Sequence, residues 1–301
     1  MYDKEMLVSA LGEAVCFNEP MKNHTSFKTG GNADIFISPR CEEELVSSYK
    51  ALIENDIPYI VMGNGTNLLF SDKGLRGAVL HIQKGIDSVV IRDDTVLAAS
   101  GVLLSVLSSM TADASLSGLE FASGIPGTLG GAVYMNAGAY DGEIKDYFVS
   151  ARIINEDGEI ESIGKEDMCF GYRESVLSKR NCIILSARLK LKPGNKDEIK
   201  EKIIDFGNKR REKQPLNLPS AGSTFKRPEG FFAGKLIEDA GLKGREIGGA
   251  AVSEKHAGFI VNKGDATSED ILKLIKLCQD TVFEKFGVKL VPEVKIIGEY
   301  L

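Results

Sequence analysis

One glycine-rich stretch, residues 118–142, constrains this chain more than any other feature. It reads GLEFASGIPGTLGGAVYMNAGAYDG and contains seven glycines. Glycine loses more backbone entropy on folding than any other residue, so packing alone would not select so many. A glycine-rich main chain can approach a bound phosphate or diphosphate closely and turn its N–H groups towards it. The stretch is also compatible with a tight, buried crossing between strands, and its residues leave both interpretations open.

A second glycine segment, residues 63–69, directly follows a predicted strand at 58–62 and reads GNGTNLL. A strand that feeds a Gly-Asn-Gly turn with a threonine hydroxyl can hold an anion. The segment is neither a P-loop nor a G-x-G-x-x-G fingerprint. Alone it also suits a plain turn, because Asn-Gly tolerates the left-handed conformation. Together, the two segments favour a dinucleotide whose diphosphate lies between two glycine-rich backbones.

Composition excludes several classes of function. The chain has 301 residues, 43% of them apolar and 27% charged, which is typical of a soluble globular protein of two or three domains. A net charge of −6 and an isoelectric point near 5.4 argue against nucleic acid or an anionic membrane as the main partner.

The five cysteines form no C-x-x-C motif, and the three histidines are scattered, so we expect no metal site and no disulfide framework. The N-terminal residues are not typical of a signal peptide, and no apolar run approaches the ~18 residues of a membrane span. These features favour the cytoplasm.

The first part of the chain predicts a βαβ unit. Residues 5–15 have helical apolar spacing. A strand at 33–37 precedes Ser38-Pro39, which we expect to begin a helix, and the strand at 58–62 completes the unit.

The middle of the chain predicts an α+β unit dominated by antiparallel strands. Residues 102–110 have helical spacing, and Glu156-Asp157-Gly158 predicts a hairpin turn. The expected strands cover residues 78–82, 88–91, 96–99, 149–155, 159–163 and 181–191.

The last third begins at a predicted boundary over residues 192–197. A helix at 198–213 ends in the basic residues Lys209, Arg210, Arg211 and Lys213, which match the helix dipole and leave a phosphate role open for one of them. Beyond it we expect helices at 231–240 and 267–286 and strands at 250–252, 259–262 and 290–297. The predicted domains are residues 1–75, 76–195 and 196–301.

Three short polar pieces could carry chemistry. They read GYRES (171–175), SAGSTFKRP (220–228) and LVPEV (290–294), and they supply Arg173, Ser223 and Glu293. Each residue also has an ordinary structural explanation. Arg173 could form a surface ion pair, Ser223 could cap a turn, and Glu293 could lie on an edge strand, where proline is allowed.

These pieces, taken in order with NHTSFKTGGNAD, GNGTNLL, SGIPGTLGGAVYMNAGAY, KQP, KHAGFIVN and VPEV, closely resemble the MurB family of UDP-N-acetylenolpyruvoylglucosamine reductases. The resemblance runs from about residue 20 to the end. The segment between Lys179 and Lys213 is too short for the extra tyrosine loop of some members, so the chain resembles the shorter subtype. The resemblance implies an α+β fold: a two-part FAD-binding region of the PCMH/vanillyl-alcohol-oxidase type, followed by a C-terminal α+β substrate-binding domain.

The resemblance also implies noncovalent FAD, with NADPH as the hydride donor and UDP-N-acetylglucosamine enolpyruvate as the substrate. The product would be UDP-N-acetylmuramate, a precursor of peptidoglycan and therefore of cell wall, cell shape and division. The residues implied to bind FAD are Gly63, Asn64, Gly65, Thr66, Asn67, Leu68, Ser123, Gly124, Ile125, Pro126, Gly127, Gly130, Gly131 and Ala132.

The family pattern implies catalytic roles for Arg173, Ser223 and Glu293. The positions that match substrate contacts are Tyr172, Lys213, Arg227 and His256. Arg227 replaces an asparagine of some members, and His256 could equally be structural. A neighbouring cation such as Lys226 would help Ser223 to act as an acid.

Two other functions remain open. The chain could be a different FAD-dependent oxidoreductase on the same fold, although the SAGSTFKRP and VPEV motifs would then lack a purpose. It could also be a catalytically silent nucleotide-binding module, although the intact set of arginine, serine and glutamate argues against that.

Overall fold

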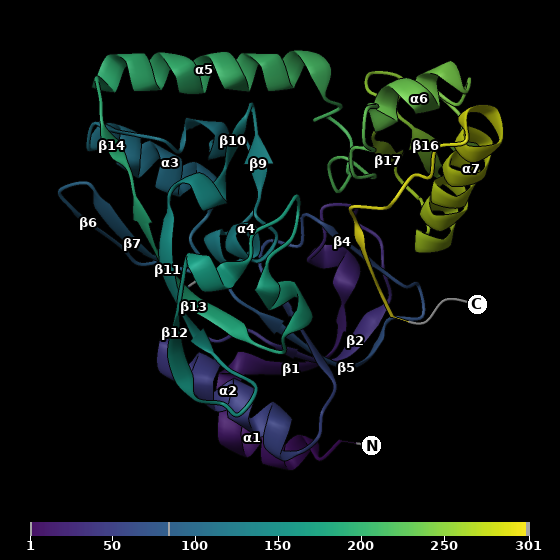
Figure 1. The fold of residues 1–301 in the computed structure, drawn as a ribbon. Helices are drawn as coiled ribbons and strands as arrows, with labels where there is room; N and C mark the ends of the chain where they lie inside the picture. Colours follow the sequence, from purple (N-terminus) through teal and green to yellow (C-terminus); the bar gives the residue numbers. More distant parts are fainter. Residues whose placement is uncertain (1, 84, 299–301) are drawn as a thin grey trace. The chain divides into compact units, whose positions relative to one another are not determined.

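The computed structural model describes residues 2–83 and 85–298 (Figure 1). The chain forms two compact units and passes between them several times. The first unit comprises residues 1–16, 35–64 and 77–210, and the second comprises residues 17–34, 65–76 and 211–301. The predicted domains at 1–75, 76–195 and 196–301 are sequential, whereas these units interleave along the chain.

A five-stranded antiparallel sheet, in the order β12-β11-β13-β7-β6, is the centre of the first unit. Its strands are β6 (Val89–Arg92), β7 (Thr95–Ala99), β11 (Phe148–Ile154), β12 (Ile160–Gly164) and β13 (Ile183–Lys190). The predicted antiparallel character is confirmed. The hairpin between β11 and β12 is confirmed too, because Asn155 Oδ1 accepts the N–H groups of Asp157 and Glu159 at 3.1 and 2.9 Å and closes the turn.

Two helices, α3 (Leu104–Asp113) and α4 (Leu129–Tyr134), belong to the same hydrophobic core as this sheet. Leu107, Leu129 and Val133 are fully buried with Ile153 and Leu189 of the strands. Each such side chain contributes about 1.5–3 kcal/mol by leaving water. This core therefore fixes the glycine-rich stretch, which contains α4.

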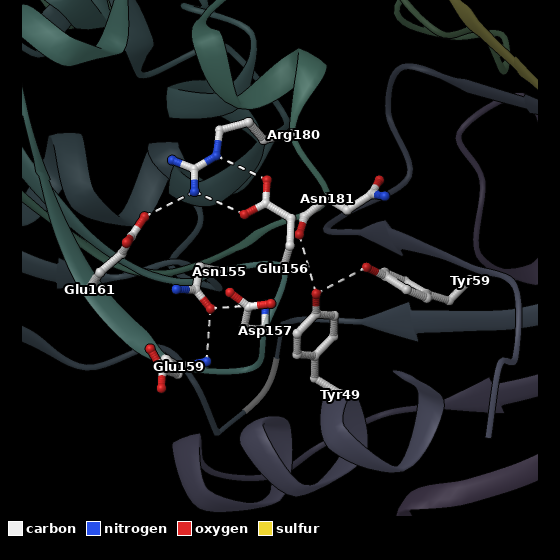
Figure 2. A network of polar contacts seen from close by, with 9 residues as sticks. All are labelled: Tyr49, Tyr59, Asn155, Glu156, Asp157, Glu159, Glu161, Arg180 and Asn181. Atoms are coloured by element: carbon white, nitrogen blue, oxygen red, sulfur yellow. Dashed lines mark hydrogen bonds and ion pairs between the residues drawn. The ribbon is translucent and has the colours of Figure 1, made fainter. Parts of the chain in front are cut away.

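A salt-bridge cluster braces the β11–β12 hairpin (Figure 2). Arg180 lies 2.9 Å from Glu156 and 3.0 Å from Glu161, and its hydrogen bond lowers the pKa of Glu156 to about 2. The Tyr49 hydroxyl donates to the carbonyl of Asn181 at 3.2 Å. Arg180 and Asn181 are thus both bonded to neighbouring elements.

The N-terminal region contains α1 (Lys4–Leu11), β1 (Val15–Pro20), β2 (Asn32–Ile37), α2 (Glu42–Glu54), β3 (Tyr59–Met62) and β5 (Leu75–His81). The strands have the order β1-β2-β5-β3, and β3 pairs with β5 in parallel. The predicted βαβ unit is present, with β5 between its two strands. Two boundaries were wrong: α1 ends at Leu11, before Gly12, whose φ is +55°, and α2 is capped by Cys41 instead of beginning at Ser38.

The second unit contains α6 (Ala233–Asp239), α7 (Ser268–Phe286) and an antiparallel sheet of β15 (Glu246–Ile247), β16 (Ala250–Val252) and β17 (Ile260–Asn262). The predicted start and end of α7 are confirmed: Thr267 and Asp270 form a capping box, and Gly287 closes the helix with φ +68°. Near the end of α7, the side chains of Phe283 and Phe286 are 49% and 41% exposed.

The predicted strand at 290–297 was too long. Only β18 (Lys295–Ile297) is a strand, and it pairs in parallel with β4 (Leu68–Phe70). Pro292 makes a single bridge with Phe225, because proline has no N–H to donate to a longer ladder.

The remaining elements are short, apart from one long helix, α5 (Lys196–Lys213). The short strands are β8 (Leu116–Ser117), β9 (Gly138–Ala139), β10 (Gly142–Glu143) and β14 (Lys192–Pro193), and the 3₁₀ turns are Gly12–Ala14, Met21–Asn23, Glu120–Ala122, Ile144–Asp146, Glu166–Met168 and Val176–Lys179. None of the helices within residues 2–83 and 85–298 combines the length and apolar character that a membrane span requires.

Candidate active site

Within the first unit, Gly63 and Asn64 of the first glycine segment lie against the second glycine segment. Asn64 Nδ2 donates to the carbonyl of Pro126 at 2.6 Å, and its Oδ1 accepts from Gln83 at 3.0 Å. A Cβ added at Gly63 would overlap Thr128 Oγ1, so the two backbones approach as closely as glycine allows. Residues 62 apart in the sequence therefore form one surface of main chain and small polar side chains, as a diphosphate cradle requires.

The glycines of residues 118–142 do not all serve the same purpose. A Cβ at Gly118 would lie 2.5 Å from the Tyr147 ring, and one at Gly142 would lie 2.7 Å from the Phe121 ring. These two glycines are therefore required for packing. A Cβ at Gly131 would meet only Thr128 Oγ1, at 3.7 Å, and Gly131 is exposed. The protein leaves open space there, which is what a ligand needs.

Arg210, near the end of α5, places a cation beside this surface. A Cβ at Gly124 would lie 3.1 Å from Arg210 Cδ. Burial lowers the pKa of the guanidinium, and this group makes no hydrogen bond or ion pair within the part of the chain that the structure describes. A half-buried guanidinium with that environment suits an anionic ligand. Together with the open space at Gly131, it shows that these residues fit a dinucleotide diphosphate.

Arg173 lies in the first unit on a strained loop. Its φ is +57°, and its Nη2 donates to the carbonyl of Gly138 at 2.8 Å. Its guanidinium carbon lies 5.0 Å from the centre of the Tyr172 ring. The Gly171 N–H donates to Glu174 O at 3.0 Å and closes the turn. The loop thus presents Tyr172 and Arg173 side by side.

Ser223 and Glu293 belong to adjacent backbones in the second unit. The Glu293 N–H donates to Thr224 O at 2.8 Å, and the Lys226 N–H donates to Val291 O at 2.8 Å. Thr224 is buried, and its Oγ1 accepts the N–H of Ile260 at 3.0 Å. The segment that carries Ser223 is therefore fixed on both sides.

Asn67, in the first glycine segment, contacts the segment that carries Glu293 as well. Its Nδ2 donates to Glu293 O at 3.1 Å, and its carbonyl accepts from the Lys295 N–H at 2.9 Å. Asn67, which is predicted to bind the cofactor, therefore also fixes the peptide group of Glu293, a predicted catalytic residue.

The predicted substrate residues of the second unit lie in different surroundings. The guanidinium carbon of Arg227 lies 4.0 Å from the Phe232 ring centre. Lys213 is exposed at the end of α5. His256 Nδ1 accepts the N–H of Gly258 at 3.1 Å, and burial lowers the pKa of its imidazole. His256 is thus held in its neutral form.

Sequence reasoning did not single out Asn136, Thr224 or Gln83, and it could not choose Arg210 from its basic neighbours. Asn136 is fully buried. Its side-chain amide donates to Gly171 O, in the loop that carries Arg173, and to Glu143 Oε2 in β10. Its only sequence signal is an asparagine among glycines. The partners lie up to 35 residues away, and spacing along the chain does not reveal them.

Residues 33–164 match the family model of an FAD-binding domain. Residues 214–297 match that of the UDP-N-acetylenolpyruvoylglucosamine reductase C-terminal domain. The fold and the two matches define an FAD-dependent oxidoreductase, and the expected α+β fold with an FAD-binding region and a C-terminal domain is confirmed.

Relatives that carry the name of this reductase are similar in sequence to almost the whole chain. UDP-N-acetylenolpyruvoylglucosamine reductase of Clostridioides difficile (strain 630) is 53% identical over 95% of this chain and 94% of the relative. The reductase of Alkaliphilus oremlandii (strain OhILAs) is 52% identical over the same shares. The crystal structure of MurB from Thermus caldophilus matches with a TM-score of 0.80 and 35% identity, covering 94% of this chain and 98% of the other. The chain belongs to the UDP-N-acetylenolpyruvoylglucosamine reductase (MurB) family.

Proposed function

We propose that this protein reduces the enolpyruvyl double bond of UDP-N-acetylglucosamine enolpyruvate, with NADPH as the hydride source. The product is UDP-N-acetylmuramate, which enters peptidoglycan synthesis. The observation that carries the proposal is similarity along 95% of the chain to relatives named for this reduction. The individual roles of Arg173, Ser223 and Glu293 follow the sequence pattern of the family.

FAD, when bound, would supply the hydride-transfer chemistry that links NADPH to the substrate. The main chain of residues 63–68 and 123–132 would hold its diphosphate, and Gly131 leaves open space for close approach. Arg210 would neutralise part of its charge. This assignment explains why a guanidinium is half-buried beside Gly124.

Arg173 stabilises the negative charge that develops when the double bond is reduced. That charge moves to the carbon beside the substrate carboxylate and onto the carboxylate itself. A guanidinium already held by Gly138 O and the Tyr172 ring needs little reorganisation to meet it.

Ser223 delivers the proton that completes the reduction. A serine hydroxyl is a poor acid in water, so a cation such as Lys226 must favour its alkoxide. Glu293, fixed on the adjacent backbone, acts as a protonated carboxyl group that donates a hydrogen bond to the developing enolate.

The nucleotide part of the substrate is bound by Tyr172, Lys213 and Arg227. Phe232 orients the Arg227 guanidinium by lying under it at 4.0 Å. His256, held neutral, contributes a hydrogen bond and no charge.

The site of action we propose is the cytoplasm. All five cysteines, which lie within the described residues, are free thiols. Unpaired cysteines of this number are ordinary in a reducing compartment.

The decisive experiment follows the flavin spectrum of purified protein through two separate half-reactions. We expect yellow protein that NADPH bleaches and that the enolpyruvyl substrate, but not a simple alcohol, reoxidises. In Ser223→Ala, bleaching stays fast and reoxidation slows by about 10²–10⁴-fold, because only the second half needs the proton. Protein that binds no flavin, or that reoxidises equally well with unrelated substrates, contradicts the proposal.

A further inference from the structure

The loop of residues 171–175, called here the Arg173 loop, holds its arginine in an unfavourable backbone conformation. A φ of +57° is left-handed, which costs a residue with a Cβ about 1–2 kcal/mol. Surrounding contacts must therefore maintain it.

Three hydrogen bonds join the Arg173 loop to alternate residues of the segment 134–138. Ser175 Oγ donates to Tyr134 O at 2.6 Å. Asn136 Nδ2 donates to Gly171 O at 2.9 Å. Arg173 Nη2 donates to Gly138 O at 2.8 Å. The loop is thus held at its beginning, its middle and its end by one short segment of the glycine-rich stretch.

Asn136 is the central member of this set. Its side chain is fully buried, with Nδ2 donating to Gly171 O and Glu143 Oε2 and Oδ1 accepting the N–H of Lys145 at 3.0 Å. Only one orientation of the amide satisfies all three partners. Its own φ of +46° suits asparagine better than most residues.

The other end of the loop is equally fixed. Ser175 is 2% exposed, and its carbonyl accepts the hydroxyl of Ser178 at 2.7 Å. Five residues further on, Arg180 is tied to Glu156 and Glu161 of the hairpin, as Figure 2 shows. The arginine is therefore carried by a segment with anchors on both sides.

We propose that Asn136 and Ser175 are positioning residues that hold the Arg173 guanidinium where it meets the negative charge of the reaction. The role of these residues in the reaction rests on the proposed function. The clamp, defined as the three hydrogen bonds between residues 134–138 and the Arg173 loop, rests on contacts within the first unit alone. A fixed cation stabilises a transition state best when it needs no reorganisation, and a misplacement of about 1 Å can cost about 10²-fold in rate.

The first test is Asn136→Gly, which accepts the left-handed backbone but removes the amide. We expect reoxidation by the enolpyruvyl substrate to slow by about 10- to 100-fold, with FAD affinity and reduction by NADPH unchanged. The matched control is Asn18→Gly, because Asn18 also has a left-handed φ, of +59°, and its side chain accepts from Asn32 far from the loop in sequence. For Ser175→Ala, the control is Ser108→Ala, a buried serine whose hydroxyl has no partner within the described residues.

A double-mutant cycle shows whether Asn136 acts through the arginine. In an Arg173→Lys background, Asn136→Gly should change the reoxidation rate by less than about twofold, since the group it positions is already gone. Equal slowing in both backgrounds would mean that Asn136 does not act through Arg173, and would overturn the proposal.

A second readout needs no substrate. The rate at which phenylglyoxal modifies Arg173, followed by mass spectrometry, should rise in Asn136→Gly and Ser175→Ala and stay at the wild-type value in both controls. An unchanged labelling rate refutes the clamp, regardless of which substrate the enzyme reduces. If the wild-type flavin is not reoxidised by the enolpyruvyl substrate, the proposed function fails, and labelling alone then decides whether the clamp exists.

Discussion

Single glycines in residues 118–142 separate the two interpretations that the sequence left open. Gly118 and Gly142 lie against aromatic rings and are needed for packing, whereas Gly131 faces open space in α4. The packing interpretation therefore holds for Gly118 and Gly142, whereas Gly131 provides the space that the ligand interpretation requires. The distinction can be tested because the two kinds of glycine respond differently to a methyl group.

We expect Gly131→Ala to stabilise the cofactor-free protein by about 0.5–1 kcal/mol, because alanine is the better helix former. The same methyl group would intrude on bound FAD and weaken it by about 1–3 kcal/mol, or about 5- to 150-fold in Kd. Gly142→Ala should instead destabilise the protein without cofactor by about 1–3 kcal/mol, since its Cβ would meet Phe121. Urea unfolding and flavin fluorescence titration measure both quantities, and unaltered FAD affinity in Gly131→Ala would argue against a ligand there.

His256 gives a residue-scale prediction about pH. Burial lowers the pKa of the folded imidazole, and the Gly258 N–H aimed at Nδ1 opposes protonation there. The unfolded state, with a pKa of about 6.5, therefore binds the proton first as the pH falls. Stability from this group is complete above about pH 6.5 and is lost as the pH falls towards the folded pKa. The urea midpoint should drop less between pH 7.5 and 5.5 in His256→Gln than in the wild type; an identical drop would contradict the assignment.

At the scale of elements, α7 shows how distant residues complete a helix. Its own capping box joins Thr267 and Asp270, and the N–H groups of Ser268 and Glu269 donate to the carboxylate of Asp72, both at 2.9 Å. The N-terminal donors of the helix are thus satisfied by two segments nearly 200 residues apart in sequence. An acidic partner at this end also interacts favourably with the helix dipole.

Thr267→Ala should lower the free energy of unfolding by about 0.5–2 kcal/mol by removing the hydroxyl that accepts the Asp270 N–H. Thr267→Ser keeps the hydroxyl and serves as the control. Chemical denaturation monitored by circular dichroism gives both values, and equal losses in the two variants would show that the cap does not act through its oxygen.

Local signals in the sequence were sufficient for several elements. The Glu156-Asp157-Gly158 turn, the capping box of α7 and the strands of the central sheet depend on neighbouring residues, so their patterns were informative. The exposure of Phe283, the isolated bridge of Pro292 and the burial of Asn136 depend on contacts with remote segments. Likewise, the glycine segments could be recognised, but the bond of Asn64 to Pro126 could not, because it joins residues 62 apart.

For the whole molecule, bound FAD acts on stability by mass action. A ligand that binds only the folded state adds about 2.7 kcal/mol at a free concentration one hundred times its Kd. The melting temperature should therefore rise with FAD concentration. Arg210→Gln should reduce that rise, because it removes the cation assigned to the diphosphate.

Lys209→Gln provides the matched control at the adjacent position, where the lysine already pairs with Asp205 at 2.6 Å. Differential scanning fluorimetry with increasing FAD distinguishes the two variants. Equal shifts in both would remove Arg210 from the cofactor site.

The partners in the Arg173 clamp have a consequence for how this enzyme can diverge. All three acceptors, on Tyr134, Gly138 and Gly171, are carbonyl oxygens, which every amino acid carries. Position 134 can therefore change its side chain during evolution without losing its anchor, while the donors at 136, 173 and 175 cannot. Selection on this part of the enzyme should accordingly leave its trace at positions 136, 173 and 175 and none at position 134.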